Sequence, residues 1–172
     1  MKDMLVQVEP LIPSLRRYAR ALMRDRTTAD DLVQDCLERA VSRWHQRRDG
    51  SVRAWLFTIL HNLAVTQFRQ TATRGRHMPI DDAGERELAS AAAQEHRLIY
   101  QDVLNKLARL PEEQRAVLLL VAVEDFSYAD AAKLLDVPVG TVMSRLSRAR
   151  ERLQQEMEGV APGNVVELRS MK

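Results

Sequence analysis

The stretch SYADAAKLLDVPVGTVMSRLSRARERL, residues 127–153, decides the fold of the second half of the chain. Ser127 with Asp130 resembles a capping box, which predicts the start of a short helix over residues 127–135. A longer basic helix is predicted over residues 139–157, after the tight connection Asp136-Val137-Pro138. A short helix, a turn of three or four residues and a longer basic helix are typical of a helix-turn-helix.

The longer helix separates apolar from polar residues. Val142, Leu146, Ala149 and Leu153 follow the spacing of one helical face and are expected to pack on the core. The polar residues on or near the opposite face are Thr141, Ser144, Arg145, Arg148 and Arg152. Arg150 lies towards the flank. A solvated helix face would look similar, but the preceding helix-turn-helix pattern favours contact with phosphates and base edges.

Composition and charge fit a helical nucleic-acid-binding protein. The chain has 172 residues, of which 45% are hydrophobic and 29% charged, as expected for one or two small folded domains. Residues 1–76 carry 14 Lys/Arg against 8 Asp/Glu, whereas residues 112–172 carry 8 against 10. The first part is therefore basic, and the arginines of the last part are concentrated in one helix. Such clustering indicates nucleic-acid binding better than the net charge of +2 does.

The sequence also predicts the compartment. Cys36 is the single cysteine, which excludes a disulfide within the chain and fits a reducing cytoplasm. The first ten residues lack the apolar core of a signal peptide, and the longest apolar run, residues 116–123, is too short to span a bilayer. We expect a cytoplasmic protein without membrane insertion.

Three helices are predicted in the first half. The first follows Pro13, with an apolar face of Leu15, Tyr18, Ala19 and Leu22. Thr28, paired with Asp31 in a capping-box-like pattern, is predicted to start the second, which runs to about Trp44. Its apolar stripe is expected to comprise Val33, Leu37, Ala40 and Val41. Ser51 is predicted to cap the third, whose expected core residues are Trp55, Ile59 and Leu63.

The pattern changes after residue 72. Residues 73–95 have charges of both signs and no sustained apolar stripe, which predicts a flexible linker. Periodicity then returns over Leu98, Ile99, Val103, Leu104, Leu107 and Leu110. Pro111 is expected to begin a helix at the centre of a small bundle. The predicted fold is all-α, with helical domains over residues 1–72 and 96–158 and a tail over residues 159–172.

The second half resembles region 4 of extracytoplasmic-function (ECF) sigma factors, the smallest members of the sigma-70 family. The resemblance rests on Leu110, Pro111 and Arg115, on Phe-Ser-Tyr at 126–128, and on VPVGTVMSRLSRAR at 137–150. It implies a helix that reads the −35 promoter element. The residues expected there are Thr141, Met143, Ser144, Arg145, Ser147, Arg148 and Arg152.

The first half resembles region 2 of the same family. Residues 29–40, ADDLVQDCLERA, resemble the helix that binds core RNA polymerase, so Asp31, Gln34 and Asp35 are expected to bind the largest-subunit coiled coil. An acidic face suits a basic protein surface, although a solvated face is the simpler explanation without the resemblance. Residues 53–69 resemble the segment that melts and reads the −10 element. The expected −10 residues are Arg47, Arg48, Ser51, Asn62, Gln67 and Arg69.

This sequence departs from the family pattern at three positions. Thr66 replaces a common Asp, which leaves that contact uncertain. Asp136 replaces the usual Gly at the turn between the last two helices, and Asp tolerates a left-handed backbone. Met143 replaces a frequent Lys or Arg, so one DNA contact is in doubt and the −35 preference is expected to change.

No pattern in the sequence predicts catalysis. The four histidines lack metal-ligand spacing, Cys36 has no partner, and neither a phosphate-binding glycine loop nor a nucleophile motif is present. The carboxylates are interpreted as helix caps and surface charges. We expect a non-enzymatic protein without cofactor or metal.

Three functions fit these patterns. The first is a sigma factor that binds core polymerase and promoter DNA and is controlled by an anti-sigma factor. The second is a sigma-like decoy that binds an anti-sigma factor and never touches DNA, although such a decoy could have lost the recognition-helix arginines. The third is a helix-turn-helix repressor, which would not need the acidic face of residues 29–35.

Overall fold

The computed structural model describes residues 2–47, 50–73 and 91–158, and every regular element in those ranges is helical. The first domain contains α1 (Lys2–Val8), η1 (Glu9–Leu11), α2 (Ile12–Met23), α3 (Arg26–Arg43), η2 (Trp44–Gln46) and α4 (Val52–Thr73). The second contains α5 (Ala91–Ala108), α6 (Glu112–Leu118), η3 (Leu119–Val123), α7 (Tyr128–Leu135) and α8 (Val139–Met157). The predicted all-α fold with two helical domains is confirmed. Most of the predicted linker and all of the predicted tail lie outside the described residues.

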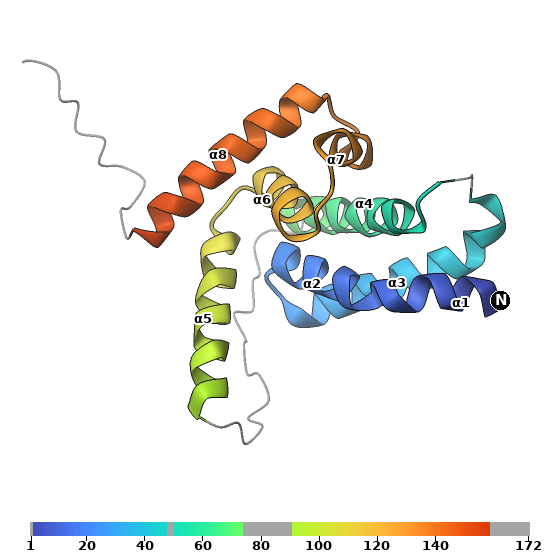
Figure 1. Ribbon diagram of the computed structural model, residues 1–172, viewed down its shortest axis with the longest axis horizontal. Helices are drawn as coiled ribbons and strands as arrows, with labels where there is room; N and C mark the ends of the chain where they lie inside the picture. The colour runs from blue at the N-terminus through green and yellow to red at the C-terminus, as the bar shows by residue number, and fades with distance from the viewer. Residues whose placement is uncertain (1, 48–49, 74–90, 159–172) are drawn as a thin grey trace, which may run out of the picture.

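The first domain is a bundle in which α2, α3 and α4 pack together, with α1 against α4 (Figure 1). The predicted face of α2 is buried in full, as Leu15, Tyr18, Ala19 and Leu22 are each at most 1% exposed. Burying one such leucine contributes about 1.5–3 kcal/mol. The helix α1 was not predicted, because its two buried residues, Met4 and Val8, are too few to form a recognisable stripe.

Two predictions about the first domain are wrong in detail. Asp25, rather than Thr28, caps α3, and its carboxylate accepts a hydrogen bond from the Thr28 amide at 2.6 Å. Val41 is 53% exposed rather than part of the core. Ser51 does cap α4, since its Oγ accepts a hydrogen bond from the Ala54 amide at 3.2 Å.

The buried stripe of α4 is shifted from the one predicted. Leu56, Phe57, Leu60, Leu63 and Ala64 are buried, whereas Trp55 and Ile59 are only partly buried. The prediction failed because α4 is apolar on several sides, and its sequence does not show which side the neighbouring helices will cover. Phe57 is fully buried because α7 and the chain before it pack on α4.

In the second domain, α6 and η3 form the centre, and α7 and α8 pack around them (Figure 1). Residues 114–120 are all buried, which confirms the predicted central helix. However, the α-helix ends at Leu118 and continues as the π-helical turn η3. Arg115 is 0% exposed, and its guanidinium donates to the Ala108 carbonyl at 3.2 Å, at the end of α5. Burial, and then the nearby charge of Arg24, lowers the pKa of Arg115 to about 10.

The helix α5 stands apart from the bundle over its first half (Figure 1). Leu107 and Leu110 pack on the core as predicted, but three residues of the predicted stripe face solvent: Leu98 is 72% exposed, Ile99 56% and Val103 41%. The apolar pattern thus predicts the helix correctly. However, half of the apolar residues in the predicted stripe are not covered by other residues of the described chain.

The two domains pack against each other. The helix α4 of the first domain contacts α7, and α2 contacts α5, α6 and η3. Tyr18, Phe57, Phe126 and Leu120 all belong to one continuous cluster of buried side chains that crosses the domain boundary. This interface was not predicted.

Candidate nucleic-acid interface

The turn of the helix-turn-helix has the geometry that the sequence predicts. Ser127 Oγ accepts a hydrogen bond from the Asp130 amide at 3.0 Å and caps α7. At the other end of α7, Asp136 adopts φ 53°, the left-handed conformation usually taken by Gly. The Val137 amide then donates to the Ala132 carbonyl at 3.0 Å. These hydrogen bonds stop α7 and set the direction in which α8 leaves the turn.

The helix α8 packs on α6 and α7 through the predicted apolar stripe. Val142, Leu146 and Ala149 are at most 2% exposed, and Leu153 is partly buried against the core. The remaining surface of α8 carries two rows of side chains, which we call its polar rows although Met143 in the second row is apolar. Thr141, Arg145, Arg148 and Arg152 follow the spacing i, i+4, i+7 and i+11 along one side. Met143 and Ser147 lie along the other side, and Ser144 lies between the rows.

The arginines of the first row are not equivalent. Arg145 is 23% exposed and forms a salt bridge of 2.7 Å with Glu113 of α6. Arg148 and Arg152 are exposed, and within the described ranges neither forms an ion pair. Arg150, which the sequence places towards the flank, is also exposed. The charge available to a phosphate therefore comes first from Arg148 and Arg152.

A second polar stripe runs along the outer face of α4. Asn62 and Arg69 are exposed and share this stripe, whereas Gln67 is half-buried and lies on another side. Thr66 is exposed between Asn62 and Arg69, and its hydroxyl donates to the Asn62 carbonyl at 2.9 Å. Sequence reasoning noted Thr66 only as a departure from the family pattern. Thr66 follows Asn62 by four residues, and this helical spacing predicts that both side chains lie on the same surface.

Two residues of the predicted −10 loop have contacts within the protein. The Arg47 guanidinium lies 5.1 Å from the centroid of the Trp44 ring and donates to the Gly50 carbonyl at 2.9 Å. Trp44 in turn packs edge to face on Trp55 at 6.0 Å. Ser51 caps α4 as described above. Arg48 lies outside the described residues.

The acidic face of α3 points to solvent. Asp31, Gln34 and Asp35 are exposed and adjacent on the helix, and Gln34 donates to Glu38 at 3.0 Å. Glu38 continues the same face and was not predicted, although it lies at i+7 from Asp31. Asp30, by contrast, is engaged by Arg20 at 2.9 Å. The structure thus brings the three predicted residues together on α3 and places them apart from the polar stripe of α4.

No described helix is long and apolar enough to cross a membrane. The described residues also contain no cluster of His, Cys, Asp or Glu that could hold a metal ion.

A two-domain helical protein with a helix-turn-helix and a basic recognition helix belongs to the class of DNA-binding transcription proteins. Residues 8–61 match the family model described as the sigma2 domain of PhyR, and residues 100–153 match region 4 of sigma-70.

Related sequences and solved structures cover most of the chain. It is 39% identical over 146 residues to the ECF RNA polymerase sigma factor EcfG of Rhodopseudomonas palustris, which covers 83% of this chain and 78% of the relative. It is 36% identical to the ECF sigma factor SigM of Mycobacterium tuberculosis over 142 residues, or 81% and 69% of the two chains. The structure of the sigma factor RpoE, solved in complex with the anti-sigma factor NepR from Bartonella quintana, matches with a TM-score of 0.74 and 31% identity. That match covers 92% of this chain and 98% of RpoE. The chain belongs to the ECF RNA polymerase sigma factors of the sigma-70 family, which are non-enzymatic transcription initiation factors.

Proposed function

We propose that this sigma factor divides its contacts among three surfaces. The acidic face of α3 (Asp31, Gln34, Asp35) binds core RNA polymerase. The polar stripe of α4 (Asn62, Thr66, Arg69) reads the −10 element with Gln67 and the loop before α4, which includes Arg47, Arg48 and Ser51. The two polar rows of α8 read the −35 element. Because DNA and polymerase are its targets, the factor acts in the cytoplasm.

The observation that carries this proposal is the state of the α8 arginines. Two of the three arginines in the first row, Arg148 and Arg152, are exposed without an ion-pair partner in the described chain, and they lie on the side away from the core. An unpaired guanidinium on a helix-turn-helix recognition helix is suited to bidentate contact with guanine or to a phosphate contact. The opposite row replaces charge with Met143, which is 54% exposed and suits apolar contact with a thymine methyl group.

Run-off transcription with core polymerase tests the −35 assignment. Arg148→Ala is expected to weaken promoter binding by about 1–3 kcal/mol if the residue contacts a base, and to lower transcription accordingly. Arg150→Ala is the matched control, because it removes the same charge from the flank of the same helix, and it is expected to have little effect. Equal transcription by wild type and Arg148→Ala would refute the assignment.

The same experiment separates the alternative functions. A decoy would support no transcription with any promoter while still binding an anti-sigma factor. A repressor would bind operator DNA tightly without polymerase. The sigma factor is expected to give transcripts that depend on both this chain and core polymerase.

We also propose that an anti-sigma factor is a partner. The exposed apolar side chains of α5, which are Leu98, Ile99, Tyr100 and Val103, support this proposal because exposed apolar patches mark protein interaction sites. RpoE of Bartonella quintana, which has a similar fold, was solved bound to an anti-sigma factor. A purified anti-sigma factor from the same genome should inhibit transcription, and Leu98→Asp should relieve the inhibition. Inhibition that is unchanged by Leu98→Asp would exclude α5 as the docking face.

A further inference from the structure

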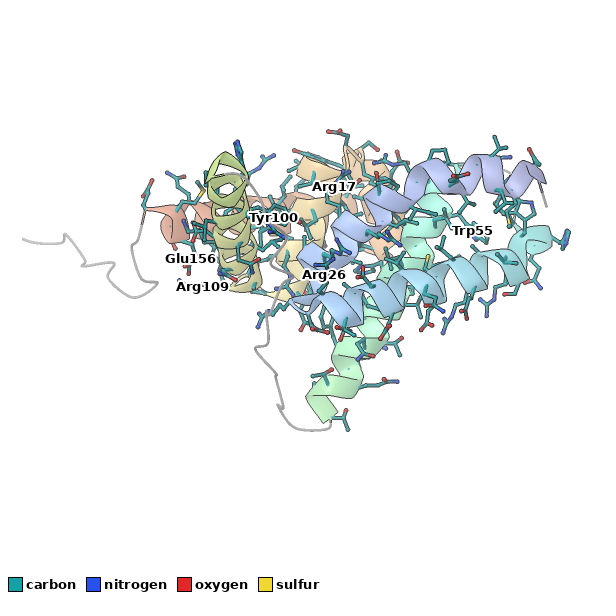
Figure 2. All side chains as sticks on the ribbon, turned by 90° about the horizontal axis from the view of Figure 1, so that it is seen from below. Arg17, Arg26, Trp55, Tyr100, Arg109 and Glu156 are labelled. Atoms are coloured by element: carbon teal, nitrogen blue, oxygen red, sulfur yellow. The ribbon has the colours of Figure 1, made fainter. Side chains whose placement is uncertain are left out.

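Glu124 is a buried charge at the boundary between the two domains. Its side chain is 1% exposed, although it follows η3 in the second domain and the sequence predicted a surface carboxylate. Both of its oxygens are engaged by Arg17 of α2, with Nε–Oε1 at 2.8 Å and Nη2–Oε2 at 2.9 Å. Figure 2 shows Arg17 on α2 beside the second domain. A bidentate arginine–carboxylate pair has defined geometry as well as charge complementarity.

Arg53, at the start of α4, is the second arginine at Glu124. Its guanidinium lies 3.6 Å from Glu124 Oε2 and also donates to the Glu124 carbonyl. The same guanidinium lies over two aromatic rings, 4.4 Å from the centroid of Phe126 and 5.5 Å from that of Phe57. Both arginines come from the first domain, whereas Glu124 and Phe126 come from the second. The interface therefore combines a paired buried charge with an aromatic cluster.

The backbone at the end of α6 is shaped to present Glu124 and Phe126 at this boundary. The Glu124 amide donates to the Leu119 carbonyl at 3.0 Å, which closes the π-helical turn η3. Asp125 then adopts the left-handed conformation, with φ 52°. The Phe126 amide donates a hydrogen bond to the Leu120 carbonyl at 2.9 Å. Single π-helical turns of this kind are rare and are frequently found at functional sites. A regular α-helix through residue 124 would change the direction of both side chains.

In the docked arrangement, the proposed −10 surface on α4 and the proposed −35 surface on α8 are close together. The two DNA elements that they would bind are far apart on a promoter. The helix α4 contacts α7, the first helix of the helix-turn-helix, so the helix-turn-helix lies against the proposed −10 helix. Elements centred about 10 and 35 bp upstream of the start are about 25 bp apart, or roughly 85 Å of B-form DNA. The helix α8, with 19 residues, is only about 28 Å long. The docked form cannot contact both elements.

We propose that Glu124, held by Arg17 and Arg53, is a latch that keeps the second domain docked on the first in the free protein. On the proposed function, on which this inference rests, the latch must open before both promoter elements can be bound. Residues 74–90, which connect the domains, are long enough to allow a separation of up to about 60 Å at roughly 3.4 Å per residue. Opening thus requires loss of the latch contacts and of the apolar contacts beside them, such as Phe57–Phe126, but no unfolding of either domain.

Distance measurements between spin labels on the full chain test the latch without polymerase. Ser42→Cys on α3 and Gln155→Cys on α8 provide one exposed label site in each domain. The native Cys36 is buried, and its burial excludes it from labelling under native conditions. The wild-type latch is expected to give a single narrow distance distribution. Glu124→Gln and Arg17→Gln are expected to broaden it and extend it to longer distances.

Two matched variants make the result specific. Arg17→Lys keeps the charge but loses the bidentate geometry, so an intermediate distribution is expected. Arg109→Gln removes the Arg109–Glu156 salt bridge, which lies within the second domain (Figure 2), and it should leave the distribution narrow. Helical circular dichroism confirms that each variant is folded. A broad distribution in the wild type, or an unchanged one in folded Glu124→Gln, would overturn the latch.

Binding to core polymerase tests the consequence of opening. If polymerase binds only the open form, the apparent dissociation constant is raised by the reciprocal of the open fraction. Glu124→Gln should then bind core polymerase about 3- to 10-fold more tightly than the wild type does. A variant that opens without gaining affinity would show that the latch does not control polymerase binding. Failure of the proposed function would appear separately, as wild-type protein that neither binds polymerase nor supports transcription.

Discussion

Phe57, in the middle of α4, and Phe126, after η3, pack edge to face with their ring centroids 5.2 Å apart. Phe57 is 0% exposed and Phe126 7%, so each ring is desolvated by residues of the other domain as well as its own. The contact is the apolar counterpart of the Arg17–Glu124 pair. The two interactions together explain why α4 is buried on a side that its sequence does not single out.

A double-mutant cycle between Phe57→Leu and Phe126→Leu should give a coupling energy of about 0.5–1.5 kcal/mol in chemical denaturation. The control is the Tyr18–Phe57 pair, which lies within the first domain at 5.4 Å. In a Glu124→Gln background, the Phe57–Phe126 coupling should disappear, whereas the Tyr18–Phe57 coupling should persist. Persistence of both couplings would contradict opening of the domains.

His61 is expected to make stability depend on pH. Burial, and then the charge of Arg145, lowers the pKa of His61 to about 4, and its Nδ1 lies 3.1 Å from the Tyr18 hydroxyl. Between this pKa and the unfolded value of 6.5, the unfolded chain binds more protons, so stability is complete above pH 6.5 and falls as the pH is lowered. Unfolding at pH 5 should cost about 2 kcal/mol less than at pH 7. His61→Gln should flatten this dependence, and an unchanged slope in that variant would assign the effect to other groups.

Asp25→Ala is expected to destabilise the first domain by about 1 kcal/mol, because the Thr28 amide at the start of α3 loses its acceptor. Thr27→Ala, one residue from Thr28, is the control and should have little effect. The Thr28 hydroxyl hydrogen bond, and then backbone hydrogen bonds, lower the pKa of Asp25. This stabilisation is therefore present above the unfolded pKa of an aspartate and is lost as the pH falls through the lower folded value. Equal unfolding midpoints for Asp25→Ala and wild type would exclude the cap.

Asp136→Gly is expected to stabilise the second domain by up to about 1 kcal/mol, since a left-handed backbone at φ 53° costs less for Gly than for Asp. Asp136→Val should destabilise it, because a β-branched residue is poorly accommodated there. Thermal unfolding of both variants measures the difference. A loss of stability in Asp136→Gly would indicate that the Asp136 side chain makes a contribution of its own.

Cys36 should be unreactive in the folded protein. It is 0% exposed, and burial raises the pKa of its thiol to about 12. The thiolate is the reactive form, so alkylation at pH 8 should be at least about 100-fold slower than for an exposed cysteine such as Ser42→Cys. Denaturant should restore the ordinary rate. Rapid alkylation of the native protein would show that α3 and α4 separate readily at this position.

The local elements of this chain were largely predictable. The helix-turn-helix, the buried stripe of α8 and the left-handed Asp136 all follow from short-range patterns, because caps, turns and helical faces involve residues close in the sequence. The same holds for the buried face of α2. Errors occurred where a helix is apolar on more than one side, as with Trp55 on α4 and Val103 on α5.

The candidate surfaces were only partly predictable. Spacing along α3 and α8 grouped the acidic face and the two polar rows correctly, but it could not show that Arg145 pairs with Glu113 or that Arg47 stacks on Trp44. Glu38 and Thr66 could have been added from spacing alone. Which polar residues are already engaged depends on neighbours from other helices.

The sequence by itself determined most of the helices, the caps at Ser51 and Ser127 and the family to which the chain belongs, because these depend on local spacing and short motifs. Only the tertiary structure decided that Glu124 is buried and that Arg17, Arg53 and Phe57 belong to a domain interface. Arg17 and Glu124 are 107 residues apart in the chain. Glu124 is buried because the two domains pack against each other. The sequence pattern of each domain determines its own helices and does not contain the information on how the domains pack.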